Sequence, residues 1–239
     1  MDDQTEPNRS FTPSPRTTPT RHRDRVSYDR AAAHRVLDAT PFCHVGFVVE
    51  GRPVVLPQLH VRVDDWLYLH GSSGARGLRL ASDGGLAVCV TVTLVDGLVL
   101  ARSAFNHSIN YRSVVVHGTA LPVVDPQHKA EALASLVDAV VPGRSAETRG
   151  PSDRELAATA VLRLPLEEVS LKVRSGPPVD EPEDLALPHW AGVLPLSTTA
   201  GAPESAPDLP DTVQLPEHVR RGREAWTSRT PPGRGRSVG

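Results

Sequence analysis

The stretch that decides the fold runs from Phe42 to His70 and reads FCHVGFVVEGRPVVLPQLHVRVDDWLYLH. It contains three runs rich in β-branched and aromatic residues, and the turn-forming triplets EGR and VDD separate them. Strands that are joined by tight turns pair as antiparallel neighbours. The stretch therefore predicts a meander of three antiparallel strands.

Two prolines distinguish the second strand of this meander from its neighbours. Pro53 and Pro57 have no N–H group and cannot donate a hydrogen bond to an adjacent strand. We therefore expect this strand to lie at an edge, to be bulged, or to be approached by something other than a strand. A ligand is one such neighbour.

Helix and strand patterns continue on both sides of the meander. Helices are predicted in SYDRAAAHRVLDAT with Ser27 as its cap, in RGLRLAS, in PQHKAEALASLVDAVVPG, and in PSDRELAAT with a capping box of Ser152 and Glu155. Strands are predicted in LAVCVTVTL, YRSVVVHGTALPVV and AVLRLPLEEVSLKVRSG. This mixture predicts an α+β fold in which an antiparallel barrel carries a few peripheral helices.

Composition divides the 239 residues into three parts. Residues 1–24 are rich in Pro, Thr and Arg and show no periodicity, so they predict a disordered N-terminal arm. Residues 25–196 predict one folded domain, because they contain the periodic apolar patterns. Residues 197–239 are rich in Pro and Arg and predict a disordered C-terminal tail.

Charge, hydropathy and cysteine usage argue against several classes of partner. The net charge of −2 gives no electrostatic case for binding nucleic acid. No apolar run is long enough to cross a bilayer, and the first residues lack the apolar core of a signal peptide. Cys43 and Cys89 form no C-x-x-C pair and predict reduced thiols. We therefore expect a cytoplasmic protein that binds neither nucleic acid nor membranes.

The segment LYLHGSSGARGLRL, from Leu67 to Leu80, combines the parts of an anion site. Its glycines allow successive N–H groups to point to one side, its serines add hydroxyl donors, and its first arginine adds a planar charged fork. The residues concerned are Gly71, Ser72, Ser73, Gly74 and Arg76. The same composition also suits a plain turn beside a surface charge, and the residues alone leave both readings open.

Other common site motifs are missing from the sequence. It contains no G-x-S-x-G elbow, Walker loop, dinucleotide fingerprint or H-E-x-x-H pair. The histidines in the central region do not have the spacing of metal ligands, so no metal ion is predicted. These histidines are His44, His60, His70, His107 and His117.

Three blocks of the chain, taken together, resemble a known family. They are the block from Phe42 to Leu80, then VCVTVTLVDGLVLARSAFNHSINYRSVVVHGTA, then VSLKVRSGPPVDEPEDLALPHWAGVLPL. Their order and spacing, over roughly Tyr28 to Leu196, are similar to the flavin-nucleotide-binding branch of the pyridoxamine 5'-phosphate oxidase-like superfamily, which the nitroimidazole-resistance reductases also resemble. The resemblance implies an antiparallel split β-barrel that binds FMN at the interface of a homodimer.

The resemblance also implies roles for individual residues. The strand matching VVLPQ would lie along the isoalloxazine, and the segment matching YLHGSSGAR would hold the phosphate. His70 would lie near the reactive part of the flavin as a catalytic, proton-handling residue, and Arg112 with Ser113 would reach the cofactor from the other subunit. The FMN contacts inferred in this way are Val55, Leu56, Pro57, Gln58, His70, Gly71, Ser72, Ser73, Arg76, Arg112, Ser113, Lys172 and Trp190.

Two classes of function follow from this resemblance. The first is an FMN-dependent oxidoreductase that acts on an unknown small molecule, with a nicotinamide as a possible electron donor. The C-terminal substrate-binding block of the oxidase proper is not recognisable, so the substrate is not assigned. The second is a haem- or flavin-binding protein without turnover, with one of the barrel histidines as axial ligand; those histidines are His44, His60, His70 and His117. A deazaflavin-dependent reductase on the same barrel is a third possibility.

Overall fold

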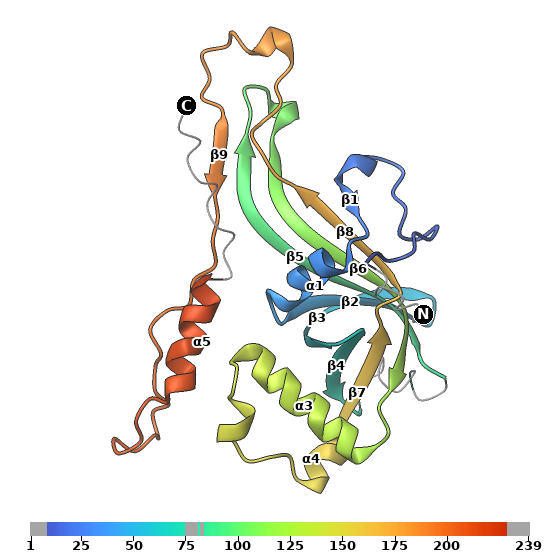
Figure 1. The fold of residues 1–239 in the computed structure, drawn as a ribbon, viewed down its shortest axis with the longest axis vertical. Coiled ribbons are helices and arrows are strands. Elements are labelled where there is room, and N and C mark those ends of the chain that lie inside the picture. Colours follow the sequence, from blue (N-terminus) through green and yellow to red (C-terminus); the bar gives the residue numbers. More distant parts are fainter. Residues whose placement is uncertain (1–8, 75–80, 82–83, 229–239) are drawn as a thin grey trace, which may run out of the picture. The chain divides into compact units, whose positions relative to one another are not determined.

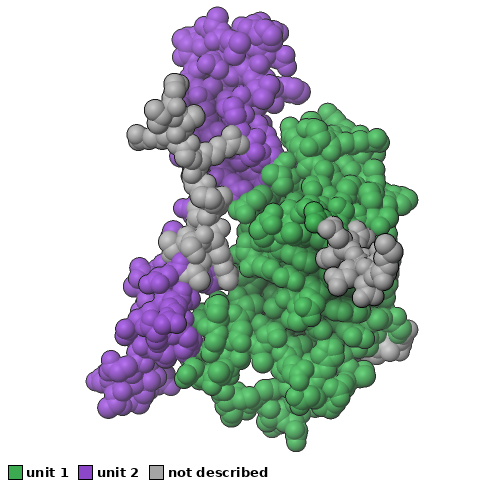
Figure 2. All heavy atoms as spheres, in the orientation of Figure 1, with its two compact units in different colours: residues 1–94, 112–173 green, residues 95–111, 174–239 purple. Residues whose placement is uncertain are grey.

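The computed structural model describes residues 9–74, 81 and 84–228. The chain forms two compact units, one of residues 1–94 and 112–173 and the other of residues 95–111 and 174–239 (Figure 2). The predicted helix RGLRLAS lies outside the described residues, except for Ala81.

The first unit is built on an antiparallel barrel (Figure 1). Its strands are β1 (Val26–Ser27), β2 (Phe42–Val49), β3 (Arg52–Val63), β4 (Trp66–Ser72), β5 (Leu86–Leu100), β6 (Ser108–Pro122), β7 (Thr159–Pro165) and β8 (Glu168–Arg174), of which β5 and β6 continue into the second unit. The pairing order is β1-β8-β6-β7-β4-β3-β2-β5-β9. An additional β6–β5 pairing closes the six strands from β6 to β5 into a ring. The predicted α+β split-barrel class is confirmed.

The meander predicted from Phe42 to His70 is present as β2, β3 and β4. The β2–β3 ladder runs from Phe42↔Leu59 to Val49↔Arg52, whereas the β3–β4 ladder holds only from His60↔Leu69 to Val63↔Trp66. Within the described residues, the first two thirds of β3 therefore pairs with one strand only. Pro53 and Pro57 lie in this part, as expected from their missing N–H groups.

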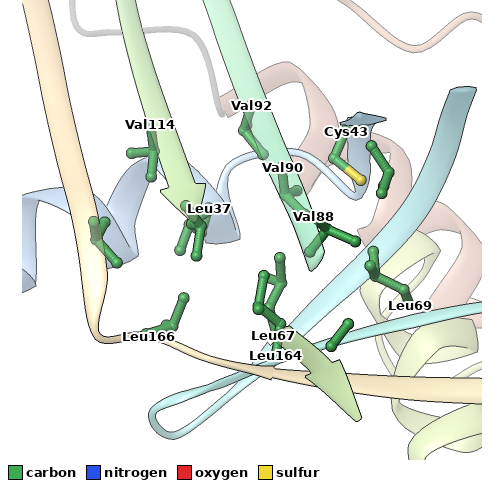
Figure 3. Close-up of a cluster of buried hydrophobic side chains, with 14 of the residues drawn as sticks. Leu37, Cys43, Leu67, Leu69, Val88, Val90, Val92, Val114, Leu164 and Leu166 are labelled. Atoms are coloured by element: carbon green, nitrogen blue, oxygen red, sulfur yellow. The ribbon is translucent and has the colours of Figure 1, made fainter. Parts of the chain in front are cut away.

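The barrel interior is a close-packed apolar core (Figure 3). Its largest fully buried apolar side chains are Leu37, Leu67, Leu69, Leu164, Leu166, Val90, Val92, Val114 and Val116. Helix α1 (Arg30–Asp38) contributes Leu37 to this core, but its cap differs from the prediction. The Asp29 carboxylate accepts the hydrogen bond from the Ala32 N–H at 2.6 Å, whereas Ser27 belongs to β1.

Helices α3 (Pro126–Val140) and α4 (Asp153–Ala158) form where the sequence predicts helices. The Asp125 carboxylate caps α3 by accepting from the His128 N–H at 2.7 Å, and the predicted capping box of Ser152 and Glu155 begins α4. The sequence AVLRLPLEEVSLKVRSG was predicted as one strand, but it forms two. Strand β7 pairs with β4, and β8 turns away to pair with β1.

Part of the predicted N-terminal arm is packed. Phe11 is only 2% exposed and belongs to the main core, and its N–H donates to the Tyr28 carbonyl at 2.8 Å. Thr17 is also buried. The disorder predicted for residues 1–24 therefore does not extend to these positions, where one aromatic side chain anchors a polar segment.

The second unit contains the distal ends of β5 and β6, strand β9 (Gly192–Pro195) and helix α5 (Glu217–Ser228). Strand β9 pairs with β5 from Gly97↔Pro195 to Leu100↔Gly192. Helix α5 lies in the tail that was predicted to be disordered. No helix in the described parts of the chain combines the length and the apolar character that crossing a membrane requires.

Candidate cofactor site

The two segments predicted to bind FMN lie where β3 and β4 separate. The last paired residues are His60 and Leu69, and beyond them β3 continues back through Gln58 and Leu56 while β4 continues to Gly71 and Ser72. The β3–β4 ladder ends early. The strand predicted to contact the flavin ring and the segment predicted to bind the phosphate therefore lie on the two sides of one opening.

A cavity of about 200 Å³ lies at this opening, which we call the barrel cavity. It brings together four of the predicted contacts, namely Leu56, Gln58, Gly71 and Ser72. Its other walls are core side chains, namely Val45, Phe47, Leu69, Leu86, Val88 and Leu162. Pockets that enclose a whole ligand measure about 300 to 1,000 Å³, so this cavity accommodates only part of a flavin nucleotide.

The other two predicted ring contacts on β3 lie on its opposite face. Side chains alternate between the two faces of a strand, so Val55 and Pro57 turn away from the cavity that Leu56 and Gln58 line. Val55 is 63% exposed. Of the four ring contacts predicted on β3, two thus face the barrel cavity and two face away from it. Strand β3 presents apolar side chains on both faces.

A second cavity, of about 540 Å³, lies beneath helix α3, and we call it the α3 cavity. Its apolar wall is formed mainly by Leu133, Ala134, Leu136, Val137, Val140 and Val141. Its polar rim is formed by Arg144, Ser145, Thr148 and Arg149 on the connection from α3 to α4 and by Glu155 in α4. Leu59 of β3, His70 of β4, Gly150 and Pro151 complete the lining.

His70 therefore belongs to the α3 cavity and not to the barrel cavity. It precedes Gly71 on β4, and neighbouring residues of a strand face opposite sides. Its Nδ1 is buried and has no hydrogen-bond partner among the described residues. Burial lowers the pKa of His70, which keeps the imidazole neutral at neutral pH. A neutral imidazole beside a roomy cavity can act as a base or as a metal ligand.

The predicted phosphate cradle is only partly free to bind an anion. The Ser73 N–H donates to the Ala158 carbonyl at 2.9 Å, and the Gly74 N–H donates to the Ser72 hydroxyl at 3.3 Å. Two backbone donors of the cradle are therefore already used, while the side chain of Ser73 is exposed. Arg76 lies outside the described residues.

The remaining predicted contacts line neither cavity. Arg112 and Ser113 lie on β6, and Lys172 lies on β8 opposite Val26 of β1. Trp190 lies in the second unit and is 68% exposed. Of the predicted contacts, the barrel cavity thus brings together Leu56, Gln58, Gly71 and Ser72, which come from β3 and β4.

Sequence reasoning missed the α3 cavity and its arginines. Arg144 and Arg149 follow the helix in a connection that has no motif, and only the folded chain places them near His70. Among the described residues, no group of three or more His, Cys, Asp or Glu side chains is arranged to hold a metal ion. Both cysteines are free thiols, and burial raises the pKa of Cys43 to about 12.

Comparison with known proteins identifies relatives over most of the chain. Residues 29–173 match the family model described as pyridoxamine 5'-phosphate oxidase. The flavocytochrome Anf3 from Azotobacter vinelandii is 41% identical, with a TM-score of 0.83 over 88% of this chain and 98% of that one. The FAD and heme binding protein from Mycobacterium smegmatis is 40% identical, with a TM-score of 0.79 over 83% of this chain and 97% of that one.

A more distant structure shares the fold alone. It comes from Bacteroides thetaiotaomicron, is assigned to 5-nitroimidazole antibiotic resistance, and is 23% identical with a TM-score of 0.52 over 62% of this chain and 86% of that one. A comparison with curated proteins finds no match.

Proposed function

The chain belongs to the pyridoxamine 5'-phosphate oxidase family, and we propose that it is a redox protein that binds both a flavin nucleotide and a haem. The flavin would lie along β3 and the segment after β4, and the haem would occupy the α3 cavity. The two relatives near 40% identity, a flavocytochrome and a protein that binds FAD and haem, support this pairing of cofactors.

One observation carries the proposal: the two cavities lie on opposite faces of the same strand. His70 lines the α3 cavity, whereas its neighbours Leu69 and Gly71 line the barrel cavity. The backbone of β4 therefore separates the two cavities. Two redox groups held in this way would be close enough to exchange electrons within one chain.

The α3 cavity suits a haem in size and in chemistry. At about 540 Å³ it falls within the range of cofactor pockets, and six aliphatic side chains from α3 and its C-terminal cap form its wall. Among the residues that the structure describes, His70 is the one histidine that lines it, and its Nδ1 has no hydrogen-bond partner there. Metal ligation requires a neutral imidazole, and the lowered pKa of His70 favours that form.

The opening between β3 and β4 suits the flavin ring. Leu56 gives an apolar contact, and Gln58 and Ser72 add hydrogen-bonding groups at the same opening. FMN is the cofactor expected from the sequence, whereas FAD is the one named for the Mycobacterium smegmatis relative. The proposed cofactor is therefore a flavin nucleotide, and titration with FMN and with FAD distinguishes the two.

The chemistry would be divided between cofactors and protein. The flavin would supply two-electron exchange with a small-molecule substrate or a nicotinamide donor, and the haem would supply one-electron exchange. The chain itself would hold the haem through His70 and exclude water with the aliphatic face of α3. The exposed apolar side chains Val55 and Leu56 support a homodimer in which the partner subunit covers β3.

The proposal is tested by reconstitution of the purified chain. Haem is titrated into wild-type protein, His70→Ala and a matched control, His107→Ala; His107 lines neither cavity, and its ring Nδ1 is hydrogen-bonded to the Ser103 carbonyl. We expect a shifted Soret band in wild type and in the control, and its loss or marked change in His70→Ala. A band that survives in His70→Ala but disappears in His44→Ala or His117→Ala would contradict the assignment of His70.

The flavin half of the proposal is tested separately. FMN and FAD are titrated into the chain by fluorescence quenching, and mass spectrometry identifies any flavin or deazaflavin that copurifies. We expect one flavin nucleotide per chain and a mass by light scattering near twice 25.7 kDa. A chain that binds neither flavin, or that carries a deazaflavin, would refute this half.

A further inference from the structure

The arginines and the glutamate that line the α3 cavity all belong to one segment of the chain, residues 144–155. Aliphatic side chains of α3 form its wall, and two arginines, Arg144 and Arg149, lie on the connection from α3 to α4 that forms its rim. A ligand that fills such a space has an apolar body and an anionic group at one edge. The charged residues of the rim therefore decide which end of the ligand lies there.

The two arginines differ in what they are bound to. The Arg149 guanidinium donates to both carboxylate oxygens of Glu155, at 2.8 and 2.9 Å, so its charge is already paired. This pairing holds the pKa of Glu155 at about 2. The half-buried Arg144 guanidinium forms no hydrogen bond or ion pair with any residue in the described part of the chain. Arg144 is therefore the rim cation with its charge available to a ligand.

The loop that carries Arg144 is held in place. The Asp138 carboxylate, on the last turn of α3, accepts from the N–H and from the hydroxyl of Ser145, each at 2.8 Å. The Arg144 N–H donates to the Val141 carbonyl at 3.1 Å. These three bonds fix the backbone beside Arg144 against the end of the helix. Because the loop is already ordered, less backbone freedom is lost when its cation pairs with an anion.

We propose that Arg144 forms an ion pair with a carboxylate of the molecule bound in the α3 cavity. This inference rests on the proposed function, because haem carries its two propionate carboxylates at one edge of an otherwise apolar ring. Arg144 would then set the orientation of the ring, with its carboxylate edge at the rim and its opposite edge under α3.

A simpler role for Arg144 is to offset the partial negative charge at the C-terminal end of α3. The two roles predict different results. An arginine that only stabilises the helix affects unfolding and has no preference for ligand carboxylates. An arginine that binds the ligand affects the affinity for haem only while the propionates are charged.

The experiment is a cycle between a protein substitution and a ligand substitution. Haem and its dimethyl ester, in which both carboxylates are blocked, are titrated into wild type, Arg144→Leu and the control Arg154→Leu. Arg154 is an exposed arginine near the start of α4 that does not line the cavity. We expect Arg144→Leu to weaken haem binding about tenfold, as for one charge-assisted hydrogen bond, and to leave ester binding unchanged. Arg154→Leu should bind both ligands like wild type.

Two outcomes would overturn the inference, and they can be told apart. If wild type binds haem and Arg144→Leu binds it equally well, or loses haem and ester to the same extent, the ion pair is refuted and the haem site stands. If wild type shows no Soret shift with haem at all, the proposed function fails together with the inference. Thermal unfolding of the apoproteins identifies any general loss of stability in Arg144→Leu.

Discussion

The contact between Tyr68 and His128 ties β4 to α3, the strand and the helix that enclose the α3 cavity. The Tyr68 hydroxyl and the His128 Nε2 share a hydrogen bond of 2.9 Å, and their rings meet edge to face with centroids 5.6 Å apart. Tyr68 is 7% exposed. Tyr68→Phe removes the hydroxyl and keeps the ring, so it isolates the contribution of the hydrogen bond.

The expected loss follows from the burial of the two partners. A net hydrogen bond contributes about 1 kcal/mol, and a fully buried unpaired partner would add a penalty of about 1 to 3 kcal/mol. His128 is only half-buried, so water can replace the hydroxyl and the loss should stay near 1 kcal/mol. In a chain of this size such a change lowers Tm by about 2 to 4 °C.

The assay is urea and thermal unfolding of wild type, Tyr68→Phe, His128→Ala and the double variant. If the two side chains interact, the double variant loses less stability than the sum of the single losses, by about 1 kcal/mol. Additive losses would refute the bond as a link between β4 and α3. In that case the enclosure of the α3 cavity would have to depend on apolar packing alone.

Three further predictions concern the barrel and its buried groups. Gly85→Ala should lower the free energy of unfolding by about 1 to 3 kcal/mol or more, because Gly85 has φ +103° and an added Cβ would lie 2.5 Å from the Thr119 methyl carbon; a urea midpoint equal to wild type would contradict this. The Cys43 thiol, with its pKa raised to about 12 by burial, should resist a disulfide reagent at pH 8 in the folded chain and react after unfolding. Burial lowers the pKa of His70 below 6.5, so its contribution to stability is complete above pH 6.5 and is lost as the pH falls from 6.5 through the folded-state pKa. The urea midpoints measured at pH 7.5 and at pH 5.5 should therefore differ less in His70→Gln than in wild type. An equal difference in both proteins would count against a lowered pKa of His70.

The sequence predicted the barrel because its signals are local. Alternating apolar runs and turn triplets predicted the meander from Phe42 to His70. The missing N–H groups of Pro53 and Pro57 predicted that the second strand is an edge strand, is bulged, or is approached by something other than a strand, and β3 pairs with one strand only along this part. The cap of α1 was misplaced because Ser27 and Asp29 are both good capping residues. Pairing of β1 with β8 takes Ser27 into a strand and leaves the cap to Asp29.

The candidate site was predicted only in part, because cavities depend on contacts between distant segments. The alternation of side chains along β4 already indicates that His70 and Gly71 face opposite sides, and the resemblance to a family masked that signal by grouping them. The apolar stripe of α3 is readable in the sequence. The distance between the helix and β4 decides which residues of the stripe are buried, as Leu136 is, and which also line the cavity.

The central claim is that one chain holds two redox cofactors, one on each face of β4. The most direct measurement is the absorption spectrum and cofactor content of the full chain after incubation with haem and a flavin nucleotide and removal of the excess by gel filtration. The account predicts a protein peak that carries one flavin and one haem per chain, with flavin bands and a shifted Soret band. A peak that retains neither cofactor, or in which each cofactor displaces the other, would contradict it.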